Sequence, residues 1–141
     1  MRKSVKTPVR GVDRVIDANF NRAKEGLRVC EDTARFIIDD KALTVGYKDV
    51  RHQLTDAVEV LDLKGIVRSR DVAGDVGRPT SSSESIRGNV ADIFYANTQR
   101  VKESLRVLEE FAKLISPAFA ERFKVLRYKV YGLEKKVLER L

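Results

Sequence analysis

The sequence predicts an all-α protein, a four-helix bundle made of two related helical hairpins and a glycine-rich connecting loop. Apolar residues recur at alternating steps of three and four along most of the chain, and no segment alternates with a period of two for long enough to form a sheet. In addition, one helical segment is repeated later in the sequence. We expect a single domain over residues 1–141, with hairpins at about 12–62 and 84–141 and the loop at about 64–83.

The composition fits one globular domain that needs no disulfide or structural metal. The chain has 141 residues, of which 43% are hydrophobic and 35% charged, and its net charge is +7. The single cysteine, Cys30, excludes an internal disulfide and a cysteine-rich zinc site, and it favours a reducing cytoplasm. No segment has the apolar length of a secretory signal or a membrane span, so no membrane partner is expected. The positive charge favours anionic partners without choosing among them.

Two apolar stripes define the first hairpin. The first helix is expected over residues 12–38, with Ile37 as the last residue on its stripe. Asp39 and Asp40 supply a break and a cap for the second helix, which should run over about residues 41–62. The stripe residues are Ile16, Phe20, Ala23, Leu27, Cys30, Ala34 and Ile37, then Leu43, Tyr47, Val50, Leu54, Ala57 or Val58, and Leu61.

The second hairpin follows a segment without periodicity. Residues 64–83 contain three glycines, one proline and four consecutive hydroxyl residues, a composition typical of a loop. Ser81 and Glu84 have the spacing of a capping box for the third helix. The pair Ser116-Pro117 predicts the start of the fourth helix, with a polar cap followed by proline at the first helical position.

An internal repeat relates the two hairpins. Residues 18–31 align with residues 96–109, and nine of the fourteen pairs are identical where chance would give roughly one. The shared string is A-N-x-[NQ]-R-x-K-E-x-L-R-V-x-E. The repeat predicts two hairpins packed about a pseudo-twofold axis. A weaker similarity joins the second and fourth helices, where Lys48, Val50, Arg51 and Leu54 correspond to Lys124, Leu126, Arg127 and Val130.

Polar residues kept in both copies form two ridges beside the apolar stripes. A spacing of three places each trio on one helical face. One interpretation is a polar network in which arginine pairs with glutamate and the asparagines meet across the axis. The other is a binding face in which arginine holds phosphate or carboxylate and Gly26 permits close approach. The ridges are Asn19, Arg22 and Glu25 in the first copy and Asn97, Arg100 and Glu103 in the second.

Three further features each have a functional and a structural interpretation. Lys24, Arg28 and Glu31 have the spacing of ordinary surface ion pairs and are expected on a solvated face, and the same holds for their copies Lys102, Arg106 and Glu109. The segment 68–78 holds two carboxylates, three guanidinium groups and two glycines, which suits either a Mg²⁺ and phosphate site or a solvated linker. His52 suits a phosphate contact or proton carrier, or else an ordinary surface or core residue.

Several stretches, taken together, resemble a known family. They are Asp17 to Asp32, Arg51-His52, Arg70-Asp71, Gly74 to Gly77, Ala96-Asn97 to Lys113, and Leu126-Arg127-Tyr128. In this order and at this spacing they look like the α-helical hydroxymethylpyrimidine phosphate kinase domain that is often fused ahead of thiamine phosphate synthase. The resemblance extends over about residues 12–134.

The resemblance implies a cytoplasmic phosphotransferase that uses ATP and Mg²⁺. Such a kinase converts 4-amino-5-hydroxymethyl-2-methylpyrimidine phosphate to its diphosphate, the pyrimidine precursor for thiamine phosphate synthesis. Because phosphoryl transfer depends mostly on positioning and charge neutralisation, we assign the site from residue chemistry. We expect catalytic roles for Asp75, Arg100 and His52, substrate or phosphate contacts from Asn19, Arg22, Glu25, Arg51, Arg70, Asn97 and Glu103, and Mg²⁺ on Asp71 and Asp75.

Two other functions remain open. A noncatalytic helical domain would associate with thiamine phosphate synthase and would consume no ATP. A nucleic-acid binder would use the +7 charge, but acidic residues interrupt the basic clusters and no aromatic array is available for base stacking, so nucleic acid is not an expected partner. A homodimer is compatible with the sequence. No synthase domain, which needs roughly 200 further residues, follows Leu141, so we expect either a stand-alone form or a fragment.

Overall fold

The protein is all-helical, as the sequence predicts. The computed structural model describes residues 11–79 and 85–141, and this part of the chain contains no strand. None of its helices combines the length and the apolar character that a bilayer crossing requires. The elements are α1 (Val12–Asp32), the π-helical segment η1 (Thr33–Ile38), α2 (Lys41–Val58), α3 (Leu63–Arg68), α4 (Val90–Ala112) and α5 (Pro117–Leu138).

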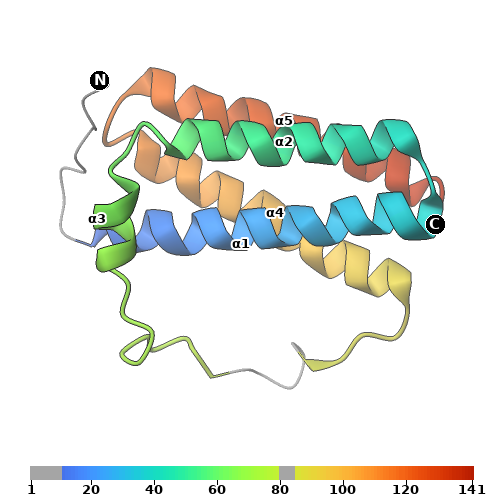
Figure 1. The fold of residues 1–141 in the computed structure, drawn as a ribbon, viewed down its shortest axis with the longest axis horizontal. Helices are drawn as coiled ribbons and strands as arrows, with labels where there is room; N and C mark the ends of the chain where they lie inside the picture. The colour runs from blue at the N-terminus through green and yellow to red at the C-terminus, as the bar shows by residue number, and fades with distance from the viewer. Residues whose placement is uncertain (1–10, 80–84) are drawn as a thin grey trace.

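Four long helices surround a shared apolar core. The α1–α2 pair lies alongside the α4–α5 pair, and α1 packs against both α2 and α4 (Figure 1). Helix α5 in turn packs against α4 and α2. Each long helix contributes side chains that are almost fully buried, among them Leu27, Tyr47, Phe94 and Phe123. The segment that follows α3 bows away from the helices on the side of α1 and α4.

Polar side chains cap the N-termini of three long helices, at or near the positions that the sequence predicts. The Asp40 carboxylate accepts from the backbone N–H of Leu43 at the start of α2, and the Ser116 hydroxyl accepts from that of Phe119 at the start of α5. Helix α4 begins later than predicted, because Asn89 caps it by accepting from the N–H of Asp92. The proposed capping residues Ser81 and Glu84 lie outside the described residues.

The first helix changes its geometry before residue 38. From Thr33 onward the backbone is π-helical, and the Thr33 hydroxyl donates to the carbonyl of Val29 at 2.9 Å. A π-turn holds more residues than an α-turn, so the apolar stripe changes its phase after Ala34. Phe36 and Ile37 are therefore exposed, whereas Ile37 was expected in the core.

A short helix occupies part of the segment that was predicted to be a loop. Helix α2 ends at Val58, and Asp62 caps α3 by accepting from the N–H of Gly65. Ile66 of α3 is buried against the core. Six residues make fewer than two helical turns, which is too short for apolar periodicity to reveal them.

Helices α1 and α4 approach each other closely at Gly26. A Cβ atom at this position would lie 2.7 Å from Cγ2 of Val101 and 3.1 Å from the backbone oxygen of Asn97. The equivalent residue in the second copy, Ser104, is small and buried. Small side chains at this pair of repeat positions let the two copies of the repeated segment pack against each other, which explains the glycine inside a helix.

Candidate functional site

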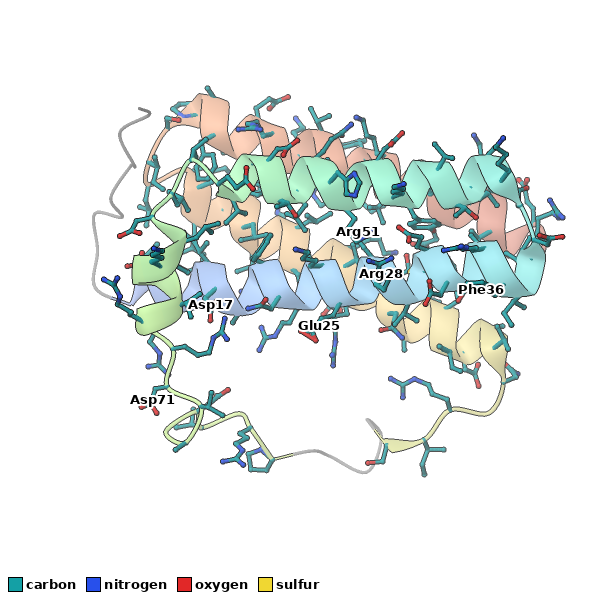
Figure 2. The ribbon with its side chains drawn as sticks, viewed as in Figure 1. Asp17, Glu25, Arg28, Phe36, Arg51 and Asp71 are labelled. Atoms are coloured by element: carbon teal, nitrogen blue, oxygen red, sulfur yellow. The ribbon has the colours of Figure 1, made fainter. Side chains whose placement is uncertain are left out.

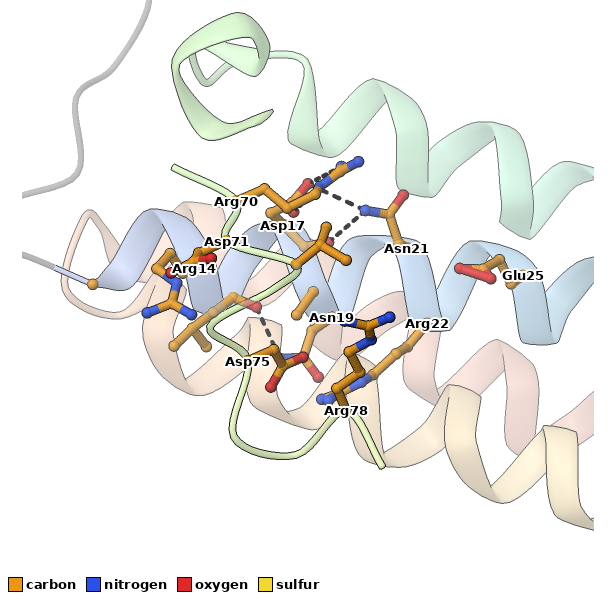
Figure 3. Close-up of a pocket in the computed structure, with 14 residues that line it drawn as sticks. Arg14, Asp17, Asn19, Asn21, Arg22, Glu25, Arg70, Asp71, Asp75 and Arg78 are labelled. Atoms are coloured by element: carbon orange, nitrogen blue, oxygen red, sulfur yellow. Dashed lines mark hydrogen bonds and ion pairs between the residues drawn. The ribbon is translucent and has the colours of Figure 1, made fainter. Parts of the chain in front are cut away.

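A pocket lies between the first half of α1 and the segment that follows α3. We call it the α1-loop pocket, and its volume is about 690 Å³. Figure 3 shows its charged and amide side chains converging from α1 and from the loop. The lining residues are Gly11, Arg14, Val15, Asp17, Ala18, Asn19, Asn21, Arg22 and Glu25, with Arg70, Asp71, Val72, Asp75 and Arg78 from the loop.

A two-point ion pair fixes the loop to α1. The Arg70 guanidinium donates to both carboxylate oxygens of Asp17, with Nη2–Oδ1 at 2.6 Å and Nε–Oδ2 at 2.7 Å. Asn21 also donates to Asp17 Oδ1 at 3.1 Å. The hydrogen bond and the negative charge of Asp17, which is buried, raise the pKa of Arg70. Arg70 is thus a structural anchor of the pocket as well as part of its lining.

The two loop aspartates shape their own turns. Asp71 Oδ1 accepts from the N–H of Gly74 at 2.8 Å, and Asp75 Oδ1 accepts from the N–H of Gly77 at 2.9 Å. Within residues 11–79 and 85–141, no cluster of three or more histidine, cysteine, aspartate or glutamate side chains is arranged to hold a metal ion. These carboxylates therefore have a structural role that the sequence-based magnesium assignment did not include.

Three arginines in the pocket remain available to a ligand. Arg14, Arg22 and Arg78 line the cavity, and none of them forms an ion pair with a described residue. Glu25 lines the same cavity and is also unpaired within the described part of the chain. Since guanidinium groups match the oxygens of phosphate and carboxylate, the pocket is suited to an anionic ligand.

The two predicted ridges lie on packed helices, but only the first lines the α1-loop pocket. Asn19 and Asn97 make the same local contact in each copy, because each side-chain amide donates to the backbone carbonyl four residues earlier at 2.8 Å. Within the described part of the chain, no hydrogen bond joins Asn19 to Asn97, so the expected pairing of the two asparagines is absent. Arg100 and Glu103 on α4 lie outside the α1-loop pocket, and Glu103 instead lines a hollow between α4 and α5.

Arg51 and His52 are also outside the α1-loop pocket. Arg51 donates to Glu31 at 3.2 Å, and Figure 2 labels Arg51 and Arg28 near the junction of α2 and α1. His52 is exposed on α2. The structure thus brings together Asn19, Arg22, Glu25, Arg70, Asp71 and Asp75 and separates them from Arg51, His52, Asn97, Arg100 and Glu103.

Buried charge clusters recur in both hairpins. Glu31, only 3% exposed, accepts from Arg28 at 2.9 Å and from Arg51. In the second hairpin Glu109 takes the place of Glu31, and it accepts from Arg106 at 3.4 Å and from Arg127 at 2.9 Å. Both glutamates were expected on a solvated face, and this expectation was wrong. The sequence held a signal for their burial, because Arg51 and Arg127, which contact them, occupy corresponding positions in the two hairpins. These clusters join the two helices within each hairpin.

A second polar group in the core was not predicted. The Thr98 hydroxyl donates to Glu134 at 3.3 Å, and Lys102 forms an ion pair with Glu134 at 2.8 Å. Burial, together with the nearby Glu134 charge, raises the pKa of the Cys30 thiol to about 12, although a hydrogen bond with Thr98 opposes this. Burial also raises the pKa of Tyr47, whose hydroxyl has no hydrogen-bond partner among the described residues. Cys30 is thus a protonated core residue and no nucleophile at neutral pH.

The chain resembles proteins named thiamine-phosphate synthase over about one third of their length. The relative from Rhodopirellula baltica is 41% identical over 124 residues, which are 87% of this chain and 33% of that protein. The relative from Synechocystis is 41% identical over 128 residues, covering 90% of this chain and 36% of that protein. The relative from Nostoc punctiforme is 38% identical over 128 residues, covering 90% of this chain and 35% of that protein. No solved structure matches the chain.

These relatives correct three of the functional predictions. They are named for the synthase and not for a kinase. The predicted phosphomethylpyrimidine kinase activity, the classification of the chain as that enzyme, and the assignment of ATP as its cofactor were therefore wrong. The expected link to thiamine phosphate synthesis agrees with the name that these relatives carry. The model of the ThiD2 family matches residues 14–136, which include both hairpins and the α1-loop pocket, and the chain belongs to this family.

Proposed function

We propose that the chain is a noncatalytic helical domain that associates with thiamine-phosphate synthase. The observation that carries the proposal is the alignment of 90% of this chain with 36% of a protein that bears this name. In such a relative the helical part and the remaining two thirds share one polypeptide, which keeps them at a high effective concentration. The two related hairpins, which we take to be a four-helix bundle, offer rigid outer faces for such a contact.

The α1-loop pocket gives this domain a second role, the binding of a phosphorylated pyrimidine. Its volume of about 690 Å³ is in the range of small-molecule sites. Arg14, Arg22 and Arg78 supply guanidinium groups for the phosphate oxygens, and Glu25 supplies an acceptor for an amino group. A domain of this kind would hold a phosphorylated substrate close to the enzyme that uses it.

Association is tested by mixing the chain with a thiamine-phosphate synthase that has no helical domain of its own. Size-exclusion chromatography with light scattering should show a complex whose mass is the sum of the two proteins. Isothermal titration calorimetry should give a saturable heat of binding. Separate elution and no heat up to about 100 µM would contradict the association.

Ligand binding is tested with the pyrimidine monophosphate and a matched pair of variants. Arg22 lines the α1-loop pocket, whereas Arg100, its copy on α4, does not. We expect Arg22→Ala to weaken binding about tenfold or more, because it removes a charge-assisted contact with phosphate. Arg100→Ala should change the affinity less than about twofold. Equal effects of the two variants would place the ligand elsewhere.

A further inference from the structure

An exposed apolar and aromatic stripe runs along α5. Val125, Tyr128 and Tyr131 are 45%, 59% and 41% exposed, and their spacing of three places them on one side of the helix. The rings of the two tyrosines contact each other edge to face, with centroids 5.5 Å apart. We call these three residues the tyrosine stripe. Exposed apolar groups that are contiguous often mark a binding surface.

A buried charge pair holds the tyrosines in place. Arg127 is 8% exposed, and it donates to Glu109 through Nη2 at 2.9 Å and through Nε at 3.2 Å. Its Nη1 donates to the Tyr131 hydroxyl at 2.8 Å, and its guanidinium lies 5.3 Å from the Tyr128 ring centroid and 5.7 Å from that of Tyr131. The stripe is therefore ordered before any partner arrives, which lowers the entropy cost of binding.

Two hollows flank the tyrosine stripe. One, of about 590 Å³, is lined by Glu121, Lys124, Val125, Tyr128 and Lys129. The other, of about 620 Å³, lies between α4 and α5 and includes Lys102, Arg106 and Tyr131. An aromatic ridge between two hollows can receive protruding side chains of a partner on both sides.

The first hairpin provides an internal comparison. The positions on α2 that correspond to the tyrosine stripe are Asp49, His52 and Thr55, which are hydrophilic. The buried Arg–Glu pair below them is nevertheless the same, since Arg51 contacts Glu31. The scaffold thus needs the charge pair in both hairpins but the tyrosines in neither, so the tyrosines require another explanation.

The charge around the tyrosine stripe indicates the kind of partner. Within α5, five exposed cationic residues face solvent together with one exposed acidic residue, Glu121. Within α2, two exposed cations are balanced by two exposed acids. A basic surface with a central aromatic ridge complements an acidic surface with an apolar centre. The cationic residues are Arg122, Lys124, Lys129, Lys135 and Lys136.

We infer that the tyrosine stripe of α5 is the docking surface of this domain and that it binds an acidic patch on the thiamine-phosphate synthase. The inference rests on the proposed association, and it adds the face that makes the contact and the chemistry of the opposing surface. Tyrosine and arginine dominate the energetic centres of protein interfaces, and the surrounding lysines steer an acidic partner.

The test compares α5 variants with variants at the corresponding positions of α2. Binding to a synthase without its own helical domain is measured by isothermal titration calorimetry. We expect Tyr128→Ala to weaken binding at least about tenfold and His52→Ala less than about twofold. Lys124→Glu should slow association at low salt, measured by stopped-flow fluorescence, whereas Lys48→Glu, at the corresponding position of α2, should not. Circular dichroism should show that all four variants keep the helical content of the parent chain, because the four side chains are exposed.

The outcomes separate the inference from the proposed function. If the unmodified chain does not bind the synthase, the proposed association is wrong and the inference fails with it. If it binds and Tyr128→Ala binds equally well, the association stands and the inference alone is overturned. If the chain forms a dimer that Tyr128→Ala disrupts, the stripe contacts a second copy, which also overturns the inference.

Discussion

The close approach of α1 and α4 at Gly26 makes a substitution there informative. Gly26→Ala adds one methyl group whose carbon would lie 2.7 Å from Cγ2 of Val101 and 3.1 Å from the backbone oxygen of Asn97. Both distances are shorter than an ordinary van der Waals contact. Val101 is buried and β-branched, so it cannot simply swing away, and the two helices must separate or Val101 must leave its preferred rotamer.

Two opposing contributions determine the size of the effect. Alanine favours a helix over glycine by about 1 kcal/mol. Overpacking a well-filled interface costs about 1–3 kcal/mol. Gly132→Ala on α5 isolates the first contribution, because a Cβ atom there meets no atom within 4 Å. We expect Gly132→Ala to stabilise the protein by about 1 kcal/mol, and Gly26→Ala to be about 1–3 kcal/mol less stable than Gly132→Ala.

The assay is urea denaturation followed by far-ultraviolet circular dichroism at 25 °C. The free energy of unfolding is compared for the parent chain and the two variants, provided that the slope against urea concentration is unchanged. A Gly26→Ala variant that gains as much stability as Gly132→Ala would refute the reasoning, because it would show that α1 and α4 do not approach closely at this point.

Three other perturbations probe the buried charges and the loop. Glu109→Gln should destabilise the protein by about 3 kcal/mol, because Arg127 remains buried without a carboxylate; an unfolding midpoint equal to that of the parent chain in urea would contradict this. Asp17→Asn should weaken the contact with Arg70, so amide hydrogen exchange in residues 70–78 should become faster while that in α5 stays the same; unchanged exchange in the loop would show that the ion pair does not anchor it. Because the pKa of Cys30 is raised in the folded state, the folded chain keeps the thiol proton between pH 9 and about 12, where the unfolded chain loses it. The contribution of this proton to the free energy of unfolding is complete below pH 9 and is lost as the pH rises toward about 12, by about 1.4 kcal/mol per pH unit. Cys30→Ala should therefore reduce the slope of the unfolding free energy against pH, measured by denaturation from pH 8 to 11.

The fold could be predicted wherever one pattern extends over many residues. Stripes of 20 or so residues identified the long helices, and local capping chemistry located the starts at Asp40 and Ser116. The end of α1 could not be predicted, because the π-turn at Thr33 changes the phase of the stripe without any marker residue. The short α3 was missed because its stability comes from the burial of Ile66 and not from its own periodicity.

The candidate site was predictable only in part, since spacing along a helix says which face a residue occupies but not what lies opposite. The ridge of α1 meets the loop aspartates, as the sequence suggested, while the equivalent ridge of α4 does not. Arg14 could not be identified, because it belongs neither to the repeat nor to the segment 68–78, whereas Arg78 is one of the three arginines for which that segment was considered as a phosphate site. The pairing of Asp17 with Arg70 joins residues 53 positions apart, and no local pattern predicts such a contact.

The duplication itself helps to separate scaffold from function. Features present in both copies, such as the buried Arg–Glu pairs and the small residues at the α1–α4 crossing, are explained by packing two similar hairpins together. The copies differ in the core near Cys30, where Thr98 and Glu134 of one half correspond to Phe20 and Val58 of the other. The first hairpin has apolar residues at both positions, so the repeat does not require the polar pair. The same logic applies to the tyrosine stripe, and it predicts that functional differences between the hairpins are concentrated at the positions where the copies diverge.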